Sequence, residues 1–268
     1  MNHRIQPDEF SGRVALVTGG GSGIGRAVAQ RWAAGGGHVT VLGRREEALR
    51  GTVELIEAAG GSADGVSCDV RDADAVDAAV DQVADRHGRL DVLVNNAAGN
   101  FVLPGEQLSP NGWKAVIDIV LNGTFHCTRA AARHMLPKGR GAVLSVIAGY
   151  AWHGHPGTVH SAAAKAGVLA MTRTLAVEWA ARGVRLNCIA PGPTETEGAA
   201  AALWPTRAAR AQVLSSVPAA RFTTPEEVAE SAAFLVSDRA AYITGDVLVA
   251  DGGQWLGKSI YTTRQDTP

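Results

Sequence analysis

The sequence predicts an α/β domain in which a sheet of seven parallel strands is doubly wound between layers of helices. Two observations carry this prediction: short, continuous apolar runs alternate with alanine-rich stretches of helical length, and a glycine cluster follows the first run. Strands that alternate with helices pair in parallel through right-handed crossovers, and continuous apolar runs are typical of strands covered on both faces. The 268 residues show no internal repeat, linker or break in composition, so we expect one domain over residues 1–268.

Each predicted strand is a short run of aliphatic and β-branched residues. The third run is the weakest of the set. The predicted strands cover residues 13–18, 38–42, 62–68, 90–94, 142–146, 184–189 and 246–249.

Six helices are predicted between these strands, and two of them carry clear start signals. Asp72 and Asp74 open the third helix at the end where acidic side chains favour the helix dipole. Thr224 and Pro225 give the last helix a cap and a proline in its first turn. An alanine-rich segment at 193–220 differs from its surroundings and is a candidate lid over the site. The predicted helices cover residues 24–35, 45–59, 72–87, 110–136, 159–182 and 225–237.

Charge and composition exclude several classes of protein. The 25 basic and 26 acidic residues leave a net charge of -1, whereas binding to nucleic acid or to an anionic membrane needs a basic excess. No apolar run is long enough for a membrane span or a secretory signal, and the C-terminus is not a peroxisomal address. Cys68, Cys127 and Cys188 are widely spaced and typical of buried thiols in a reducing compartment. We therefore expect a cytoplasmic protein.

A glycine-rich turn links the first predicted strand to the first predicted helix. It reads Thr18-Gly19-Gly20-Gly21-Ser22-Gly23-Ile24-Gly25. Glycines let the backbone turn tightly against a phosphate, and the helix N-terminus adds a partial positive charge. In this strand–turn–helix context, a phosphate-binding loop is a better reading than an ordinary flexible turn.

With this turn, the chain resembles the short-chain dehydrogenase/reductase family. The other motifs of that family follow in order: Cys68-Asp69-Val70, Asn95-Asn96-Ala97-Ala98-Gly99, Pro191-Gly192-Pro193 and Asp251-Gly252-Gly253. The resemblance covers about residues 11–255. It implies a Rossmann fold, a nicotinamide cofactor and a homotetramer. The residues that it implies for cofactor binding are Gly19, Gly21, Ser22, Gly23, Ile24, Gly25, Asp69, Val70, Asn96, Ala97, Ala98, Gly99, Lys165, Pro191, Gly192, Pro193 and Thr194.

Two arginines favour NADPH over NADH. An acid at the end of the second strand would bind the ribose hydroxyls of NAD, but the chain has Arg44 and Arg45 there. Two guanidinium groups suit a phosphate ester. The alternative is a solvated helix start in which Glu46 and Glu47 neutralise both arginines.

The usual catalytic tyrosine of the family is missing. The family pattern Tyr-xxx-Lys is represented by Lys165, but Ser161 stands in the place of tyrosine, and Ala148 falls near the usual serine. Three interpretations are open: an inactive enzyme, an enzyme that uses Ser161 as its catalytic acid, or an enzyme whose catalytic acid lies at another position in the sequence. A serine hydroxyl is far too weak an acid to replace a phenol. Tyr150, at the end of the fifth strand, is the candidate for a moved acid; its alternative role is a packing aromatic beside Trp152.

The displaced tyrosine and several sequence blocks resemble the NADPH-dependent 2,4-dienoyl-CoA reductases of fatty-acid β-oxidation. This resemblance implies that Tyr150 and Asn100 hold the thioester carbonyl, while Ser161 and Lys165 complete the catalytic network, Lys165 favouring phenolate character in Tyr150. It implies substrate contacts for Arg71, Phe101 and Ser109, and a 3-enoyl-CoA product. An acidic segment at 194–197 and Ala202, where a CoA-binding arginine is expected, depart from the pattern and leave a different acyl carrier open.

Two other functions remain open at this point: a carbonyl reductase or alcohol dehydrogenase, such as a 3-oxoacyl thioester reductase, and a non-catalytic NADP-binding protein. We expect no metal. His153 and His155 are interpreted as structural or rim residues, and His160 is expected to face outward. Asn122 lies in mid-helix, where a site role and a structural role are equally open.

Overall fold

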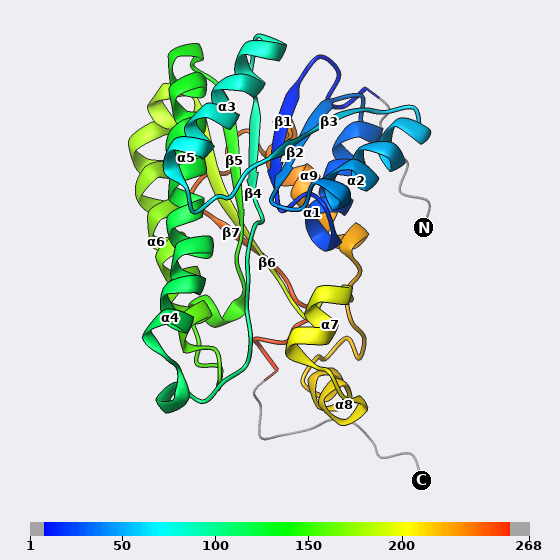
Figure 1. The fold of residues 1–268 in the computed structure, drawn as a ribbon, viewed down its shortest axis with the longest axis vertical. Helices are drawn as coiled ribbons and strands as arrows, with labels where there is room; N and C mark the ends of the chain where they lie inside the picture. The colour runs from blue at the N-terminus through cyan, green and yellow to red at the C-terminus, as the bar shows by residue number, and fades with distance from the viewer. Residues whose placement is uncertain (1–7, 258–268) are drawn as a thin grey trace.

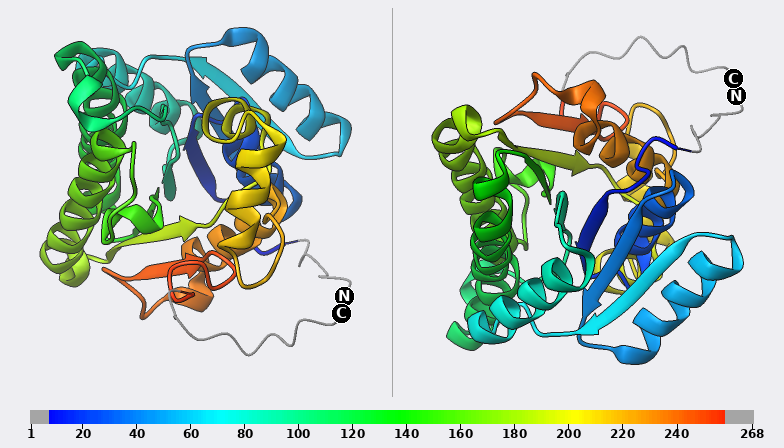
Figure 2. Two further views of the ribbon diagram at one scale, coloured as in Figure 1. Left: turned by 90° about the horizontal axis from the view of Figure 1, so that it is seen from below. Right: turned by 90° about the horizontal axis from the view of Figure 1, so that it is seen from above.

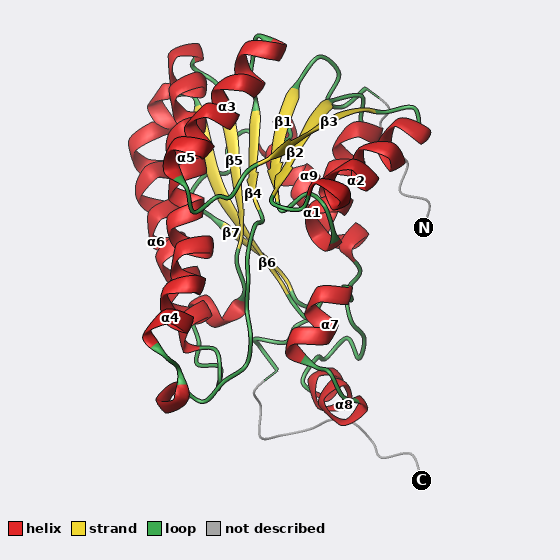
Figure 3. Cartoon of the chain, viewed as in Figure 1, coloured by secondary structure: helices red, strands yellow, loops and turns green. Residues whose placement is uncertain are grey.

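The computed structural model describes residues 8–257, apart from the side chain of Glu197. Seven strands form one sheet in the order β3-β2-β1-β4-β5-β6-β7, and every pairing between neighbours is parallel (Figure 1, Figure 3). This confirms the predicted doubly wound α/β fold. The strands are β1 Val14–Thr18, β2 His38–Gly43, β3 Ser62–Ser67, β4 Val92–Asn95, β5 Gly141–Val146, β6 Val184–Pro191 and β7 Val247–Ala250.

Helices cover both faces of the sheet. They are α1 Gly23–Ala34, α2 Glu46–Ala58, α3 Ala73–His87, α4 Pro110–Ile117, α5 Gly123–Met135, α6 Val159–Trp179, α7 Glu197–Leu203, α8 Arg207–Ser215 and α9 Pro225–Val236. Alternate residues of β1 enter two different apolar cores. Ala15 and Val17 pack with α1, α2 and α9, whereas Val14 and Leu16 pack with α3 and α5. Figure 2 shows these layers from both ends of the molecule.

The chain direction across the sheet reverses between β1 and β4. From β1 the chain moves outward through β2 to β3, and it then returns to build β4 to β7 on the other side of β1. In doubly wound sheets, ligands bind outside the carboxyl ends of the strands at such a switch point. The fold therefore places the candidate site beside the loops that follow β1 and β4.

The predicted helix starts are confirmed. The Asp72 carboxylate accepts hydrogen bonds from the backbone N–H groups of Asp74 and Ala75. Thr224 and Glu227 form a reciprocal capping box at α9, with Pro225 in the first turn. These caps satisfy backbone donors that have no partner within the helix.

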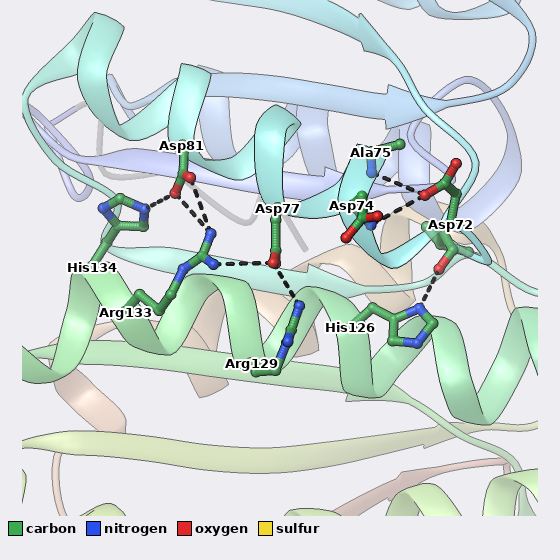
Figure 4. A network of polar contacts seen from close by, with 10 residues as sticks. Asp72, Asp74, Ala75, Asp77, Asp81, His126, Arg129, Arg133 and His134 are labelled. Atoms are coloured by element: carbon green, nitrogen blue, oxygen red, sulfur yellow. Dashed lines mark hydrogen bonds and ion pairs between the residues drawn. The ribbon is translucent and has the colours of Figure 1, made fainter.

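Ion pairs join α3 to α5 on the outer face of the molecule (Figure 4). Asp77 lies 2.6 Å from Arg129 and 3.0 Å from Arg133, and Asp81 lies 2.7 Å from His134 and 3.0 Å from Arg133. The two helices also share the apolar core that contains Val80 and Cys127. This second layer is thus held both by burial and by charge.

Two predicted segments are more complex than expected. The predicted helix 110–136 is one helical run, but a π-helical turn at Asp118–Asn122 separates α4 from α5. The candidate lid at 193–220 contains two helices, α7 and α8. All three cysteines are buried, as expected. Within residues 8–257, we find no helix whose length and apolar character would let it cross a bilayer.

Candidate active site

A cleft of about 490 Å³ opens at the carboxyl ends of β1, β2 and β4. Most of the residues predicted to bind the cofactor line it: Gly19, Gly21, Ser22, Gly23, Ile24, Arg44, Arg45, Asp69, Val70, Asn96, Ala97, Ala98 and Gly99. The same cleft is bordered by residues of α7 that the sequence analysis did not single out, among them Ala199 and Leu203. The sheet therefore brings motifs from four distant parts of the sequence to one cavity.

The glycine-rich turn is built for close contact with an anion. Gly19 and Gly23 have positive φ values of 65° and 52°, a conformation that glycine adopts without strain. Ser22 precedes α1, and its side chain makes no capping hydrogen bond with the described residues. The first N–H groups of α1 are thus left for a ligand, which is the arrangement of a phosphate site.

Gly25 has a packing role in this turn and does not line the cleft. A Cβ at Gly25 would collide with the carbonyl oxygen of Gly19 and the side-chain amide of Asn96. The glycine therefore permits the close approach of α1 to the loop after β4. Its predicted contact with the cofactor stays a prediction.

Thr18 fastens the loop after β4 to the end of β1. Its hydroxyl accepts hydrogen bonds from the backbone N–H groups of Asn96 at 2.9 Å and Ala97 at 3.0 Å. In return, the Asn96 amide donates to the backbone carbonyls of Thr18 and Gly19 at 3.1 and 3.3 Å. The sequence analysis missed this role of Thr18, although its place directly before the glycines was a signal.

Arg44 and Arg45 lie at the mouth of the cleft, where β2 ends. Both are exposed, and the ion pair of Arg44 is a long one, 4.0 Å to Asp69. The predicted alternative, neutralisation by Glu46 and Glu47, is not observed among the ion pairs of the described residues. Two cationic side chains are therefore free to meet an anionic ligand.

Asp69 has a closer partner in Arg71. The Arg71 guanidinium donates to both carboxylate oxygens, the shortest contact being 2.5 Å, and this hydrogen bonding lowers the pKa of Asp69. Arg71 is exposed beside the cleft. Its predicted contact with substrate stays a prediction.

Tyr150, Asn100 and Ser161 form one hydrogen-bonded cluster. The Tyr150 hydroxyl lies 3.2 Å from Ser161 Oγ and 3.4 Å from Asn100 Nδ2. Asn100 Oδ1 accepts from the Phe101 N–H at 2.9 Å, which turns the amide donor toward Tyr150. Asn100 also lines the cleft, so it joins this cluster to the cavity. Trp152 packs against Trp255 instead, so the alternative of a Tyr150–Trp152 pair is not what the structure contains.

The pKa of Tyr150 is raised, and the phenolate character expected from Lys165 stays a prediction. Burial is the main cause, and the hydrogen bonds with Ser161 and Asn100 offset it only in part. Lys165 is buried, and its ammonium group donates to the Val146 carbonyl at 2.5 Å instead of to Tyr150. Burial lowers the pKa of Lys165 to about 8. The cluster thus offers a neutral phenol as a hydrogen-bond donor.

Other predicted residues have structural partners. Ser109 caps α4 by accepting from the Gly112 N–H at 3.1 Å, and the Phe101 ring packs against His160 at 4.3 Å. Gly192 packs against Asp251, and with Pro193 it lines a separate, smaller pocket. Their predicted cofactor and substrate contacts, like those of Pro191 and Thr194, stay predictions.

One expectation from the sequence is wrong. His160 does not face outward: it is fully buried, and neither ring nitrogen has a hydrogen-bond partner among the described residues. Burial lowers its pKa, which favours the neutral imidazole. Asn122, whose role the sequence left open, is exposed and donates to Asp118 at 2.9 Å, which favours the structural role.

Comparison with known proteins identifies the family. A family model described as enoyl-(acyl carrier protein) reductase matches residues 19–254. A probable 2,4-dienoyl-CoA reductase, (2E)-enoyl-CoA-producing, from Bacillus subtilis is 52% identical and covers 91% of this chain and 97% of the relative. A peroxisomal 2,4-dienoyl-CoA reductase, (3E)-enoyl-CoA-producing, from Pongo abelii is 40% identical over 95% of this chain and 87% of the relative.

The solved structures agree with this assignment. A crystal structure from Beutenbergia cavernae, assigned to an NAD(P)-dependent gluconate 5-dehydrogenase with bound NADP, superposes with a TM-score of 0.89. It is 37% identical over 93% of this chain and 99% of that chain. The chain therefore belongs to the short-chain dehydrogenase/reductase family, and it is an oxidoreductase.

Proposed function

We propose that the protein is an NADPH-dependent 2,4-dienoyl-CoA reductase that acts in fatty-acid β-oxidation. The observation that carries this proposal is the Tyr150 hydroxyl, which Ser161 and Asn100 hold at the edge of the cleft. The names of the Bacillus and Pongo relatives support the same substrate class. We further propose a cytoplasmic location.

The residues of the cleft fit a phosphorylated dinucleotide. The uncapped start of α1 and the glycine turn suit the pyrophosphate, while Arg44 and Arg45 suit a 2′-phosphate. Asp69, Val70 and the loop from Asn96 to Gly99 line the remaining wall. When bound, NADPH supplies a hydride for the δ carbon of the conjugated diene. Lys165 is proposed to hold the nicotinamide ribose.

The neutral phenol of Tyr150 suits this reaction. Addition at the δ carbon pushes electron density through both double bonds onto the thioester oxygen, which becomes a dienolate. Asn100 Nδ2 and Ser161 Oγ both donate to the Tyr150 hydroxyl, which leaves the phenolic O–H as a donor for the thioester oxygen. The second amide hydrogen of Asn100 is proposed to reach the same oxygen, and donors fixed before the reaction stabilise such developing charge. No alkoxide has to be protonated, so the reaction needs a hydrogen-bond donor at the thioester oxygen more than a strong acid.

The position of protonation determines the product. A proton added to the α carbon of the dienolate gives a 3-enoyl thioester, and one added to the γ carbon gives a 2-enoyl thioester. Because Tyr150 is proposed at the carbonyl oxygen, next to the α carbon, we propose the 3-enoyl product. The Pongo relative is named for this product and the Bacillus relative for the other, so the product has to be measured.

Substrate binding is proposed at the far end of the same cleft. Arg71, Phe101 and Ser109 would contact the acyl-CoA, and the segment 193–220 would act as its lid. The acidic character of this segment is reduced because Arg210 lies 2.5 Å from Glu195. This pairing supports CoA as the carrier. We further propose the homotetramer that is usual in the family.

The test is NADPH oxidation with 2,4-hexadienoyl-CoA and 2,4-decadienoyl-CoA, followed by NMR of the product. We expect turnover with at least one dienoyl-CoA and a double bond between C3 and C4. Turnover of 3-oxoacyl-CoA or simple ketones alone would instead assign a carbonyl reductase. Binding of NADPH without turnover of any substrate would assign a non-catalytic protein, and either result would overturn the proposal.

A further inference from the structure

Two histidines and an aspartate meet at the end of the sheet opposite the cleft. His38 begins β2, Asp64 lies in β3 and His87 ends α3. His38 Nε2 and His87 Nε2 lie 3.6 and 3.3 Å from the same carboxylate oxygen, Asp64 Oδ2. Ligand atoms of all three residues lie within 4.8 Å of one another. The proposed reductase chemistry makes no use of this cluster.

The strand register explains why these residues converge. Side chains alternate between the two faces of a strand, so His38 and Thr40 point to the same face of β2. Thr40 is the register partner of Asp64 on β3, and His38 is the partner of Ser62. The last turn of α3 covers this face and supplies His87. In sequence, His38 and His87 are far apart, which is why no motif reveals the cluster.

Several buried polar atoms at this point lack partners. His38 Nε2, Asp64 Oδ1 and Thr40 Oγ1 have no hydrogen-bond partner among the described residues, and Thr40 is fully buried. Thr40 lies on the same face of β2 as His38 and opposite Asp64 in the strand register, so its hydroxyl lies close to the cluster. Buried polar atoms without partners are costly, so such a group points to a ligand that the protein atoms do not supply.

One cation already contacts the cluster from outside. Arg86 Nη1 lies 2.7 Å from Asp64 Oδ2, and the Arg86 side chain is about half exposed. It leaves Asp64 Oδ1 without a partner. Because Arg86 is exposed, it can move aside at little cost, and it is a competitor for any second cation.

We propose that His38, Asp64 and His87 bind a divalent transition-metal ion, with zinc as the best fit. Zinc takes imidazole nitrogen and carboxylate oxygen at about 2.0–2.2 Å in a tetrahedron, which sets neighbouring ligand atoms roughly 3.3–3.5 Å apart. The two observed nitrogen–oxygen separations, 3.3 and 3.6 Å, are close to this spacing, and the two imidazole nitrogens lie within 4.8 Å of each other. Water or the Thr40 hydroxyl completes the shell. The ion joins β2, β3 and α3, so it acts on stability and not on catalysis.

The test is a titration of the full chain with ZnCl2 at neutral pH after treatment with EDTA, followed by calorimetry and thermal unfolding. We expect one saturable site and a higher Tm with zinc, since a ligand that binds only the folded state stabilises it. His38→Ala and His87→Ala should each weaken binding by at least about tenfold. Arg86→Ala should strengthen it, because a competing cation is removed.

His134→Ala is the matched control, since His134 also contacts a carboxylate, Asp81, at 2.7 Å. This control should bind zinc like the unaltered protein. If His38→Ala and His134→Ala titrate alike, or if binding needs millimolar zinc, the site does not exist. Should His38→Ala fail to fold, His87→Gln and the anomalous zinc signal of a crystal decide the question. Reductase activity is measured in parallel, so a failed zinc site leaves the proposed function untouched.

Discussion

The α3–α5 face and the cluster around Tyr150 treat their polar groups in opposite ways. On α3 and α5, each of Asp77 and Asp81 has cationic side chains beside it (Figure 4). Around Tyr150, buried Lys165 has a single carbonyl partner, and buried His160 has none among the described residues. In the first region, the polar groups stabilise the packing of α3 against α5. In the second region, the Tyr150 hydroxyl accepts two hydrogen bonds and donates none to the described residues.

The largest effect on activity is expected for Tyr150→Phe, which tests the cluster around Tyr150. The substitution keeps the ring and removes one of two donors proposed for the dienolate oxygen, so we expect kcat to fall by about 10²–10³. Stability should change little, because the hydroxyl makes only long hydrogen bonds of 3.2 and 3.4 Å. The measurement is steady-state NADPH oxidation with a dienoyl-CoA. The exposed Tyr242→Phe is the control, and equal kcat values in both variants would contradict the role of Tyr150.

Lys165→Met should separate stability from activity. Burial lowers the pKa of Lys165 from the ordinary 10.5 to about 8. Below pH 8, the buried ammonium charge therefore destabilises the folded protein. Methionine removes a penalty of up to about 3 kcal/mol, and the free energy of unfolding should rise while turnover falls. Because the unfolded chain keeps this proton up to about pH 10.5, the penalty shrinks as the pH rises from 8 to 10.5.

The gain from Lys165→Met should therefore be largest at neutral pH and vanish near pH 10.5. Urea unfolding at several pH values measures it. A gain that does not depend on pH would show that the substitution acts through packing and not through the buried charge.

Arg44→Glu with Arg45→Glu tests the proposed 2′-phosphate contact. Reversing two exposed charges at the mouth of the cleft should raise KM for NADPH by about 10–100-fold. KM for NADH should change far less, since NADH lacks the phosphate. Arg50→Glu in α2, the helix that follows Arg45, is the control, because Arg50 pairs with Glu54 and does not line the cleft. Equal losses with both cofactors would remove the basis for NADPH preference.

The smallest effect is expected on the α3–α5 face. Asp77→Asn removes two partly exposed ion pairs, which should lower the free energy of unfolding by about 0.5–1 kcal/mol. Both kcat and KM should stay unchanged. Asp85→Asn, on the same helix, is the control, since the described part of the chain gives Asp85 no ion pair. A clear loss of activity in Asp77→Asn would mean that the two regions are coupled.

The sequence allowed accurate prediction where a local pattern determines the result. Apolar runs located the strands. The resemblance to the 2,4-dienoyl-CoA reductases implied that Asn100 and Tyr150 act together, and the two side chains lie 3.4 Å apart. Side-chain direction was harder, because packing between distant segments decides it. His160 is drawn inward against Phe101, which lies in another loop, and Asn122 is turned outward toward Asp118. Neither contact can be predicted from the residue pattern of the helix that contains it.

The π-helical turn between α4 and α5 lets one continuous helical run pack against two different neighbours, α6 and α3. An α-helix has about 3.6 residues per turn, and a π-helix has more than four. Four residues therefore make slightly more than one α-helical turn but less than one π-helical turn. The wider π-helical turn changes the direction in which the following side chains point. Val120 packs in the apolar cluster that contains residues of α6, whereas Cys127 packs in the apolar core that contains residues of α3. A one-residue deletion between 118 and 122 would leave a helix intact but rotate α5 by about 100° relative to α4. The length of this turn therefore determines which face of α5 meets α3.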